Sequence, residues 1–212
     1  MTIELAAKPI DATDECCGDS TTDACERDLI DRARTDPRAF ANLYRLHGPA
    51  IANYLHRRTG DAHATEDLLS ETFLAAMKSL HRFRHNGTPL RFWLYRLATN
   101  ASNRWMRALA RRRRRETLRA INPDAPARTL ERGHDIALAT HALQRLSASH
   151  QSVLVLHIVE ELTLEQVALV LGCRVGTVKS RLFRAREALR HEAHALAADE
   201  SPDPRTTKAA IT

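Results

Sequence analysis

The residues best able to do chemistry in this 212-residue chain are arginines, and they gather in two segments. Within 104–119 the arginines are accompanied by a single acid, Glu116, and within 174–190 the single acid is Glu187. A guanidinium group donates paired hydrogen bonds to phosphate oxygens and to guanine. The two segments therefore predict contacts with nucleic acid. A solvated, partly disordered basic tail is the alternative for 104–119.

Aromatic side chains lie close to the first of these segments in the sequence. Trp93, Tyr95 and Trp105 precede or begin it, and aromatic rings beside basic groups are what a surface needs to hold unstacked bases. Trp93 falls on an apolar stripe and is expected in the core, whereas the sequence leaves the environment of Trp105 open. The first segment thus indicates melted or distorted DNA, and the second indicates duplex DNA.

The composition of the whole chain agrees with a nucleic-acid partner. The net charge is +6, and the 32 basic residues are all arginine except Lys8, Lys78, Lys179 and Lys208. A GC-rich genome is a competing explanation for that excess, so the clustering carries the argument. No stretch approaches the roughly 20 apolar residues that a membrane span needs, and no secretory signal pattern opens the chain. We expect no membrane insertion and a cytoplasmic location.

The sequence contains no pattern typical of an enzyme, a cofactor site or a metal site. A phosphate-binding G-x-x-x-x-G-K-[ST] loop, an H-E-x-x-H pair and a G-x-S-x-G turn are all absent. Cys16, Cys17, Cys25 and Cys173 lack the paired spacing of zinc ligands. We interpret them as incidental thiols, with a redox role left open. The protein is predicted not to be an enzyme, and to have no cofactor and no bound metal.

The expected fold class is all-α, because apolar residues recur at steps of three and four and no run alternates strictly. Two small helical domains joined by a flexible linker are predicted, and Pro123, Pro126 and Gly133 mark the break between them. The boundaries are a flexible acidic leader over 1–24, the first domain over 25–115, the linker over 116–133, the second domain over 134–195 and a flexible tail over 196–212.

Helix signals in the first domain place its elements along the chain. Asp36 and Pro37 provide a cap and a first turn, and the apolar stripe of the helix that follows ends at Arg58. Further helices are predicted from Thr65 and after the loop 84–88. The last of these helices leads into the first arginine segment.

Two short helices across a turn are predicted in the second domain. Thr163 and Gln166 form a capping box, Gly172 ends that helix, and a second helix spans 176–190. This spacing is typical of a helix-turn-helix, whose second helix enters the major groove of DNA.

Winding the helix 176–190 at 100° per residue separates an apolar stripe from a polar face. Val178 and Leu182 fall on the stripe, and Phe183 and Arg184 fall on the opposite face. An outward arginine can bond guanine or phosphate, and an outward phenylalanine can touch a thymine methyl group. The alternative is a solvated basic helix whose Phe183 packs on a neighbouring element.

A small acidic patch contrasts with these basic surfaces. Asp61, Glu66, Asp67 and Glu71 lie within 61–72, where no lysine or arginine occurs. Because acids repel DNA, the patch either points away from it or docks on a basic protein partner. Stabilisation of a helix N-terminus is the alternative for Glu66 and Asp67, and it explains Glu71 less easily.

Several motifs, taken together in their order and spacing, resemble those of bacterial sigma factors of the extracytoplasmic-function group. The resemblance covers about 37–115 and 138–191. The motifs are Phe40-x-x-Leu43-Tyr44, Tyr54-Leu55-x-Arg57-Arg58-Thr59-Gly60-Asp61, Glu66-Asp67-Leu68-Leu69-Ser70-Glu71-Thr72-Phe73, Trp93-Leu94-Tyr95-Arg96-Leu97-Ala98-x-Asn100 and Leu171-Gly172-Cys173-x-x-Gly176-Thr177-Val178-Lys179-Ser180-Arg181-Leu182-x-Arg184-Ala185-Arg186.

The resemblance implies a protein that binds core RNA polymerase and directs it to promoter DNA. The implied contacts on polymerase are the clamp helices of the beta-prime subunit and the beta flap, and the implied regulator is an anti-sigma factor. The linker would thread through polymerase between the domains. The residues assigned to polymerase docking are Asp67, Leu68, Leu69, Ser70 and Glu71.

The same resemblance assigns two sets of residues to promoter DNA. In the first domain, residues that melt and read the minus-ten element are Arg84, Asn86, Arg96, Asn100, Arg104, Trp105 and Arg107. In the helix-turn-helix, residues that read the minus-thirty-five element are Arg174, Thr177, Lys179, Ser180, Arg181, Phe183 and Arg184.

Three positions depart from the pattern of the family. Ser147 follows Leu146 where a proline is common, Glu161 stands where a glycine is common, and Arg104 stands where an acid or an amide often follows Asn100. Two other functions stay open at this point. One is a stand-alone helix-turn-helix regulator that binds duplex DNA without polymerase, and the other is a module that titrates a polymerase subunit or an anti-sigma protein.

Overall fold

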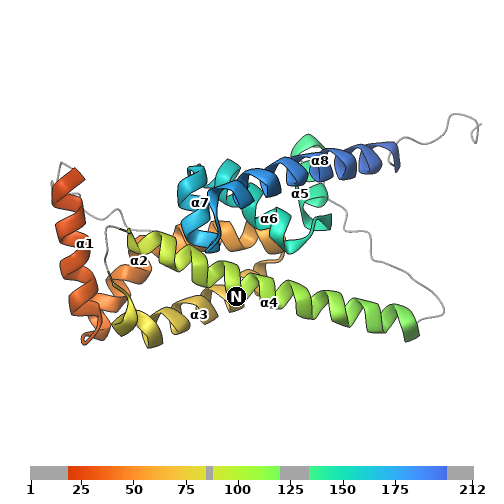
Figure 1. Ribbon diagram of the computed structural model, residues 1–212. Coiled ribbons are helices and arrows are strands. Elements are labelled where there is room, and N and C mark those ends of the chain that lie inside the picture. Colours follow the sequence, from red (N-terminus) through yellow and green to blue (C-terminus); the bar gives the residue numbers. More distant parts are fainter. Residues whose placement is uncertain (1–18, 85–87, 120–133, 200–212) are drawn as a thin grey trace, which may run out of the picture.

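The computed structural model describes residues 19–84, 88–119 and 134–199, and over these residues the chain forms helices and no strand (Figure 1). The all-α prediction is confirmed. The first domain comprises α1 (Asp19–Ala33), α2 (Pro37–Thr59), α3 (Ala62–Ser79), the 3-10 turn η1 (Leu80–Arg82) and α4 (Leu90–Arg119). The second comprises α5 (His134–Arg145), α6 (Ala148–Leu154), the π-helical turn η2 (Val155–Val159), α7 (Leu164–Leu171) and α8 (Val175–Asp199).

Helix α2 begins and ends where the sequence predicts. The side chain of Asp36 accepts a hydrogen bond from the backbone N–H of Arg38, and Pro37 occupies the first position. Gly60 ends the helix with φ 63°, a left-handed conformation that glycine adopts without a steric penalty. The helix continues through Pro49.

Helix α3 begins at Ala62, three residues earlier than predicted. The cap is Asp61, whose carboxylate accepts a hydrogen bond from the N–H of Ala64 at 3.0 Å, so Thr65 lies inside the helix. The first turn therefore contains no acid. Because the favourable effect of the helix dipole falls off within that turn, it does not explain Glu66 and Asp67.

Helix α1 begins at Asp19, six residues before the predicted start of the first domain at residue 25. Residues 19–24 are the first turns of a helix that packs on α2 and buries Ile30 and Ala33. Burial of these two side chains stabilises a helix that the polar residues preceding them do not predict. Residues 1–18 of the leader lie outside the described part of the chain.

The arginine segment of the first domain is helical. Helix α4 runs to Arg119, four residues into the predicted linker, and projects beyond the neighbouring helices (Figure 1). Arginine is a good helix former, so a disordered tail is the wrong description of 104–119. The remainder of the linker, 120–133, lies outside the described residues.

The two predicted ends of α7 are as expected: Thr163 and Gln166 form its capping box, and Gly172 ends it with φ 64°. Ser147, which is not among the predicted caps, caps α6. Glu161, which stands where the family commonly has glycine, has φ 54°. The last helix extends to Asp199, past the predicted start of the tail at residue 196.

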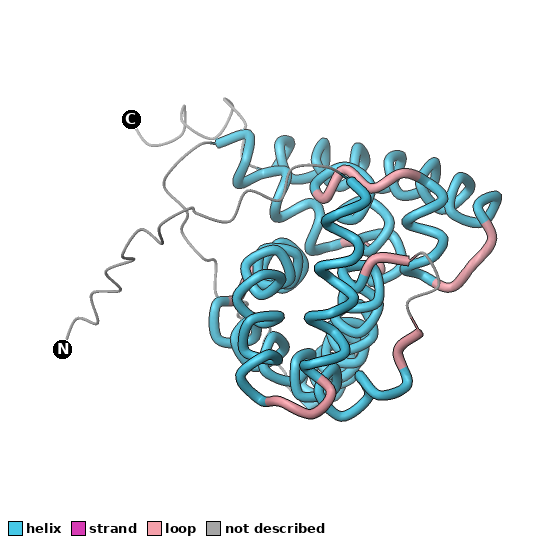
Figure 2. Tube along the Cα trace, turned by 90° about the vertical axis from the view of Figure 1, so that its left-hand side faces the viewer, coloured by secondary structure: helices cyan, strands magenta, loops and turns pink. Residues whose placement is uncertain are grey.

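The two domains pack directly on each other in this structure. Helix α7 lies on α4, and α5 and η2 lie on α2. Figure 2, which turns the molecule by 90°, shows the helices of both domains gathered in one body.

Candidate nucleic-acid interface

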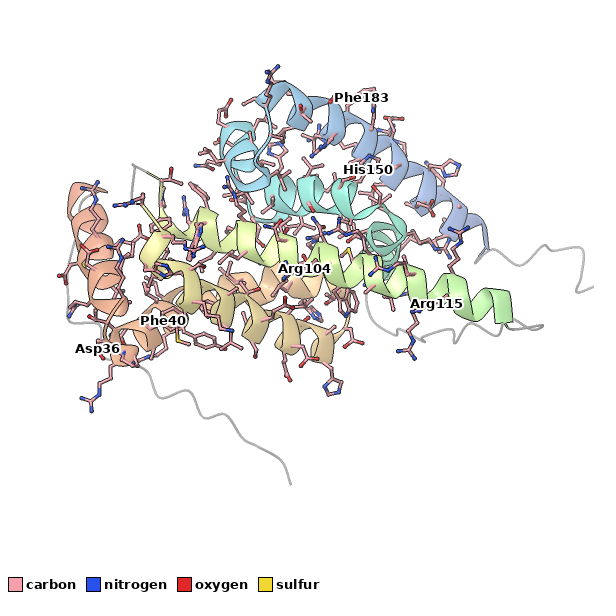
Figure 3. The ribbon with its side chains drawn as sticks, turned by 60° about the horizontal axis from the view of Figure 1, so that its bottom comes forward. Asp36, Phe40, Arg104, Arg115, His150 and Phe183 are labelled. Atoms are coloured by element: carbon pink, nitrogen blue, oxygen red, sulfur yellow. The ribbon has the colours of Figure 1, made fainter. Side chains whose placement is uncertain are left out.

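Helix α8 presents the predicted polar face to solvent. Val178 and Ala185 are fully buried, whereas the side chain of Phe183 is 69% exposed and Arg184 is exposed beside it. Figure 3 shows Phe183 on the outer side of α8, away from α4. Phe183 therefore does not pack on a neighbouring element, and the alternative for this residue is wrong.

The other predicted residues of the helix-turn-helix fall into two groups. Arg174, Lys179 and Ser180 are exposed, and Thr177 is half-buried in the first turn of α8. Arg181 is half-buried and lines a cavity of about 240 Å³ between the two domains, opposite α4. The exposed group forms a basic surface at the start of α8, while Arg181 faces the first domain.

The predicted minus-ten residues do not line one site: Arg84 and Arg96 lie around the start of α4, whereas Arg104, Trp105 and Arg107 lie further along this helix, against α3. Trp93 is half-buried and its ring packs on that of Phe83 with centroids 5.2 Å apart. Arg84 and Arg96 line a cavity of about 280 Å³ together with these rings and with Leu169 of the second domain. Asn86 lies outside the described residues.

Arg104 and Glu71 form an ion pair that the sequence reasoning missed. The Nη2 of Arg104 lies 2.5 Å from Oε1 of Glu71, and the two side chains are 59% and 51% exposed. They line a groove of about 620 Å³ between α3 and α4, together with Asp67, Trp105 and Arg107. The resemblance assigns these residues to different partners, and the structure brings them together.

The predicted polymerase-docking residues do not all reach the surface. Asp67, Ser70 and Glu71 are exposed and Leu69 is half-buried, but Leu68 is only 3% exposed. Leu68 packs in the core of the first domain because it points to the opposite side of α3 from Ser70. It holds α3 in place and is not itself a contact surface.

Two exposed apolar side chains extend the outer face of α3, and the sequence reasoning missed them. Leu74 is 52% exposed and Met77 is 50% exposed. They follow Asp67, Ser70 and Glu71 at helical steps of three and four, so all five side chains share one face. The sequence contained this information, because Leu74 and Met77 follow Asp67 and Glu71 at the helical steps of three and four residues that place side chains on one face.

Arg58 is a buried arginine at the boundary between the domains. Its side chain is 1% exposed, as its place on the apolar stripe of α2 predicts. Its guanidinium donates to Ser102 Oγ at 2.5 Å and Asn103 Oδ1 at 2.7 Å in the first domain, and to the carbonyl oxygen of Ala148 at 3.1 Å in the second. Among the residues that the structure describes, its Nε has no hydrogen-bond partner.

A second set of polar contacts joins α4 to the second domain. Tyr95 donates a hydrogen bond to the carboxylate of Glu160, and Arg96 donates to the carbonyl oxygens of Leu169 and Val170. Burial raises the pKa of Glu160 above its ordinary value, although the Tyr95 bond and nearby Arg57 oppose that shift. Asn100, one turn further along α4, is exposed and lines the 240 Å³ cavity with Arg181.

His47 is a largely buried histidine on α2. Burial lowers the pKa of its imidazole. The negative charge of Glu26 on α1 partly offsets this shift, and the positive charge of Arg91 on α4 adds to it. Glu26 lies 3.7 Å from the imidazole Nε2. This histidine belongs to the core and not to the DNA-binding surfaces.

Over the described residues, no group of three histidine, cysteine, aspartate or glutamate side chains is placed to hold a metal ion. Cys25 and Cys173 carry free thiols. No described helix combines the length and the apolarity that crossing a membrane requires.

Both domains match known protein families. The family described as Sigma-70 region 2 matches residues 43–115, and the family described as Sigma-70, region 4 matches residues 136–189. The chain belongs to the extracytoplasmic-function (ECF) sigma factors. A stand-alone helix-turn-helix regulator would have no need of the first of these domains.

Curated relatives and a solved structure agree with this assignment. The ECF sigma factor is 33% identical to the RNA polymerase sigma factor YlaC of Bacillus subtilis, over 72% of this chain and 90% of YlaC. It is also 33% identical to the ECF RNA polymerase sigma factor SigL of Mycobacterium tuberculosis, over 70% of this chain and 85% of SigL. The sigma factor RpoE of Bartonella quintana, solved in complex with the anti-sigma factor NepR, superposes with a TM-score of 0.57 at 25% identity, over 72% of this chain and 95% of RpoE.

Proposed function

We propose that this sigma factor divides promoter initiation among three surfaces: the outer face of α3 docks on core polymerase, the start of α4 reads the minus-ten element, and α8 reads the minus-thirty-five element. The observation that carries the proposal is the contrast in chemistry between the outer face of α3 and the exposed face of α8. An acidic and apolar face on α3 and a basic, exposed face on α8 are suited to different partners.

The outer face of α3 is suited to a protein and not to DNA. Asp67 and Glu71 carry negative charge, and Leu74 and Met77 add exposed apolar surface along the same face. Exposed apolar side chains beside charges of one sign are typical of a surface that docks on a partner of the opposite charge. We assign this face to the clamp helices of the beta-prime subunit.

The cavity beside Trp93 is suited to a base of the melted minus-ten strand. Its walls combine aromatic rings with Arg84 and Arg96, and its volume is about 280 Å³. Aromatic walls offer stacking to a base of any sequence, and arginine offers hydrogen bonds to the base edge or the phosphate. Extruding a base costs a few kcal/mol, which the contacts of polymerase and sigma factor must offset.

The start of α8 is suited to the major groove of duplex DNA. Lys179 and Arg184 supply positive charge, and the exposed ring of Phe183 supplies an apolar contact. In the same domain, Ile158 and Val159 are exposed apolar side chains of η2. We assign these two to the beta flap.

The proposal extends to the biological setting of the protein. The sigma factor acts in the cytoplasm, where polymerase and promoter DNA meet, and has no catalytic activity of its own. An anti-sigma factor is its expected regulator, because the similar sigma factor RpoE was solved with the anti-sigma factor NepR.

The docking surface is tested by charge reversal on α3. Asp67→Lys should weaken binding of the full-length protein to core polymerase at least tenfold, measured by surface plasmon resonance. Glu66→Lys is the matched control, because Glu66 is exposed on the same helix and turned by about 100° from Asp67. Equal losses for the two variants, or no loss for Asp67→Lys, would contradict the assignment.

A further inference from the structure

The polar cavity of about 240 Å³ between the two domains is lined by basic and hydrogen-bonding side chains. Its polar lining residues are Arg96, Thr99, Asn100 and Asn103 of α4, Ser149 and Ser152 of α6, and Arg181 of α8. None of the described residues that line it is an acid. The cavity therefore has two guanidinium groups in its walls and no carboxylate that offsets their charge.

Arg181 supplies this cavity with an unpaired guanidinium. The residue is half-buried, and within the described part of the chain it makes no hydrogen bond and no ion pair. A guanidinium has five N–H donors and no acceptor, and partial burial removes some of the water that would otherwise satisfy them. An oxyanion in the cavity would balance this charge and accept its hydrogen bonds.

The wall formed by α4 adds amide donors. The Nη2 of Arg58 donates to Asn103 Oδ1 at 2.7 Å. Since arginine only donates, the Asn103 atom that faces it must be the oxygen, so the Nδ2 amide of Asn103 is left to donate elsewhere. Asn100, about one turn earlier, is exposed and makes no hydrogen bond to a described residue. Both asparagines line the cavity, so an anion there would find donors on α4 as well as on α8.

The C-terminal end of α7 also borders the cavity, and a helix C-terminus carries partial negative charge that repels an anion. Arg96 compensates this end, because its guanidinium donates to the carbonyl oxygens of Leu169 and Val170. The charge of Arg96 is therefore engaged by the helix end, whereas the charge of Arg181 stays available for a ligand.

The size of the cavity limits its occupant to a small molecule. Pockets for drug-sized ligands enclose about 300–1,000 Å³, and this cavity is smaller. Helices of both domains bound it, which leaves no room for a DNA duplex. Asn100, Ser149 and Gly172 in its walls are exposed, so a small anion can enter from solvent.

We propose that this cavity binds the phosphate group of a small anion, with Arg181 as the charged ligand and Asn100 and Asn103 as further donors. Inorganic phosphate and the phosphate ester of a small metabolite share the chemistry that these side chains recognise. The proposal concerns the free protein, and it does not depend on the assignment of Arg181 to promoter DNA.

Isothermal titration calorimetry of the free full-length protein tests whether the site exists. Inorganic phosphate and glycerol 3-phosphate are titrated separately at constant ionic strength. We expect saturable binding of one equivalent of at least one of these anions, and the tighter of the two identifies the source of the phosphate group. Absence of saturable binding by both anions would overturn the proposal.

Arg181→Gln tests whether the anion lies in this cavity. Arg186→Gln is the matched control, because it removes the same charge from an exposed arginine of the same helix that does not line the cavity. Arg181→Gln should weaken binding at least tenfold, and Arg186→Gln should stay within twofold of the wild type. Equal losses in the two variants would indicate general attraction of anions to a basic protein and would overturn the proposal.

A variant of the first domain covers the case in which Arg181→Gln fails to fold. Asn100→Asp places a carboxylate at an exposed position on the α4 wall, where it repels an anion and can pair with Arg181. Asn42→Asp is its control, because it makes the same change at an exposed residue of α2 outside the cavity. Asn100→Asp should weaken binding at least tenfold and Asn42→Asp should not. Unchanged binding by Asn100→Asp would contradict a site that both domains form.

Discussion

The ion pair between Glu71 and Arg104 predicts that removing an acid from the proposed docking face improves DNA binding. In the wild type, Arg104 must leave the carboxylate of Glu71, 2.5 Å away, before it can bond to the minus-ten strand. In Glu71→Gln the charge that holds Arg104 is gone. Binding of the strand should therefore become tighter.

The size of the effect follows from the exposure of the pair. Both side chains are more than half exposed, at 59% and 51%. Exposed ion pairs contribute about 0.2–1 kcal/mol, which corresponds to a gain in affinity of about 1.4- to 5-fold.

The assay is fluorescence anisotropy of a labelled minus-ten oligonucleotide with the sigma factor bound to saturating core polymerase. Saturation removes any effect of Glu71 on docking from the measurement. The control is the same substitution in an Arg104→Gln background, where Glu71→Gln should add nothing if the pair alone carries the effect. An equal gain in both backgrounds, or a coupling above tenfold, would refute the reasoning.

Three further predictions follow from single residues. Arg184→Ala should reduce discrimination between a promoter and the same DNA with a scrambled minus-thirty-five element by about 1–3 kcal/mol, measured by competition binding; an equal loss on random DNA would count against base contact. Glu161→Gly should raise the free energy of unfolding by about 0.5–1 kcal/mol, because the left-handed φ of 54° is strained for glutamate; a loss on chemical denaturation would contradict this. Burial lowers the pKa of His47 in the folded protein. As the pH falls through 6.5, this histidine is therefore protonated in the unfolded chain before it is protonated in the folded protein. The free energy of unfolding should then fall, and less so in His47→Gln; identical pH profiles from urea titrations would exclude this role.

The helix ends that the sequence predicts well are those set by local chemistry. Asp36 before Pro37, the capping box of Thr163 and Gln166, and the left-handed Gly172 each satisfy backbone groups within a few residues. Their partners are fixed by spacing along the chain, so no knowledge of packing is needed. The burial of Val178 and the exposure of Phe183 follow in the same way from helical periodicity.

The helix ends that the sequence predicts poorly depend on choices between similar signals or on distant packing. Asp61 and Thr65 can both mark the start of a helix; the sequence prediction starts at Thr65, whereas Asp61 is the cap and the helix begins at Ala62. Helix α1 depends on α2, against which Ile30 is buried. The continuation of α4 to Arg119 depends on helix propensity outweighing repulsion among arginines.

The contacts between the domains were beyond sequence reasoning altogether. Arg58 and Ala148 are 90 residues apart in the chain, and Tyr95 and Glu160 are 65 apart. A buried arginine was signalled by its place on the apolar stripe of α2, but its partner was not. The ion pair of Arg104 with Glu71, 33 residues away, joins two motifs that the resemblance treats as separate.

The most direct test of the central claim is transcription by core polymerase with and without this protein. Purified protein and core enzyme are incubated with fragmented DNA of the source genome, and the 5′ ends of the transcripts are mapped. A promoter-directing sigma factor predicts discrete starts that share elements near minus ten and minus thirty-five and that are missing with core enzyme alone. Tight binding to core polymerase without any new start would contradict the account.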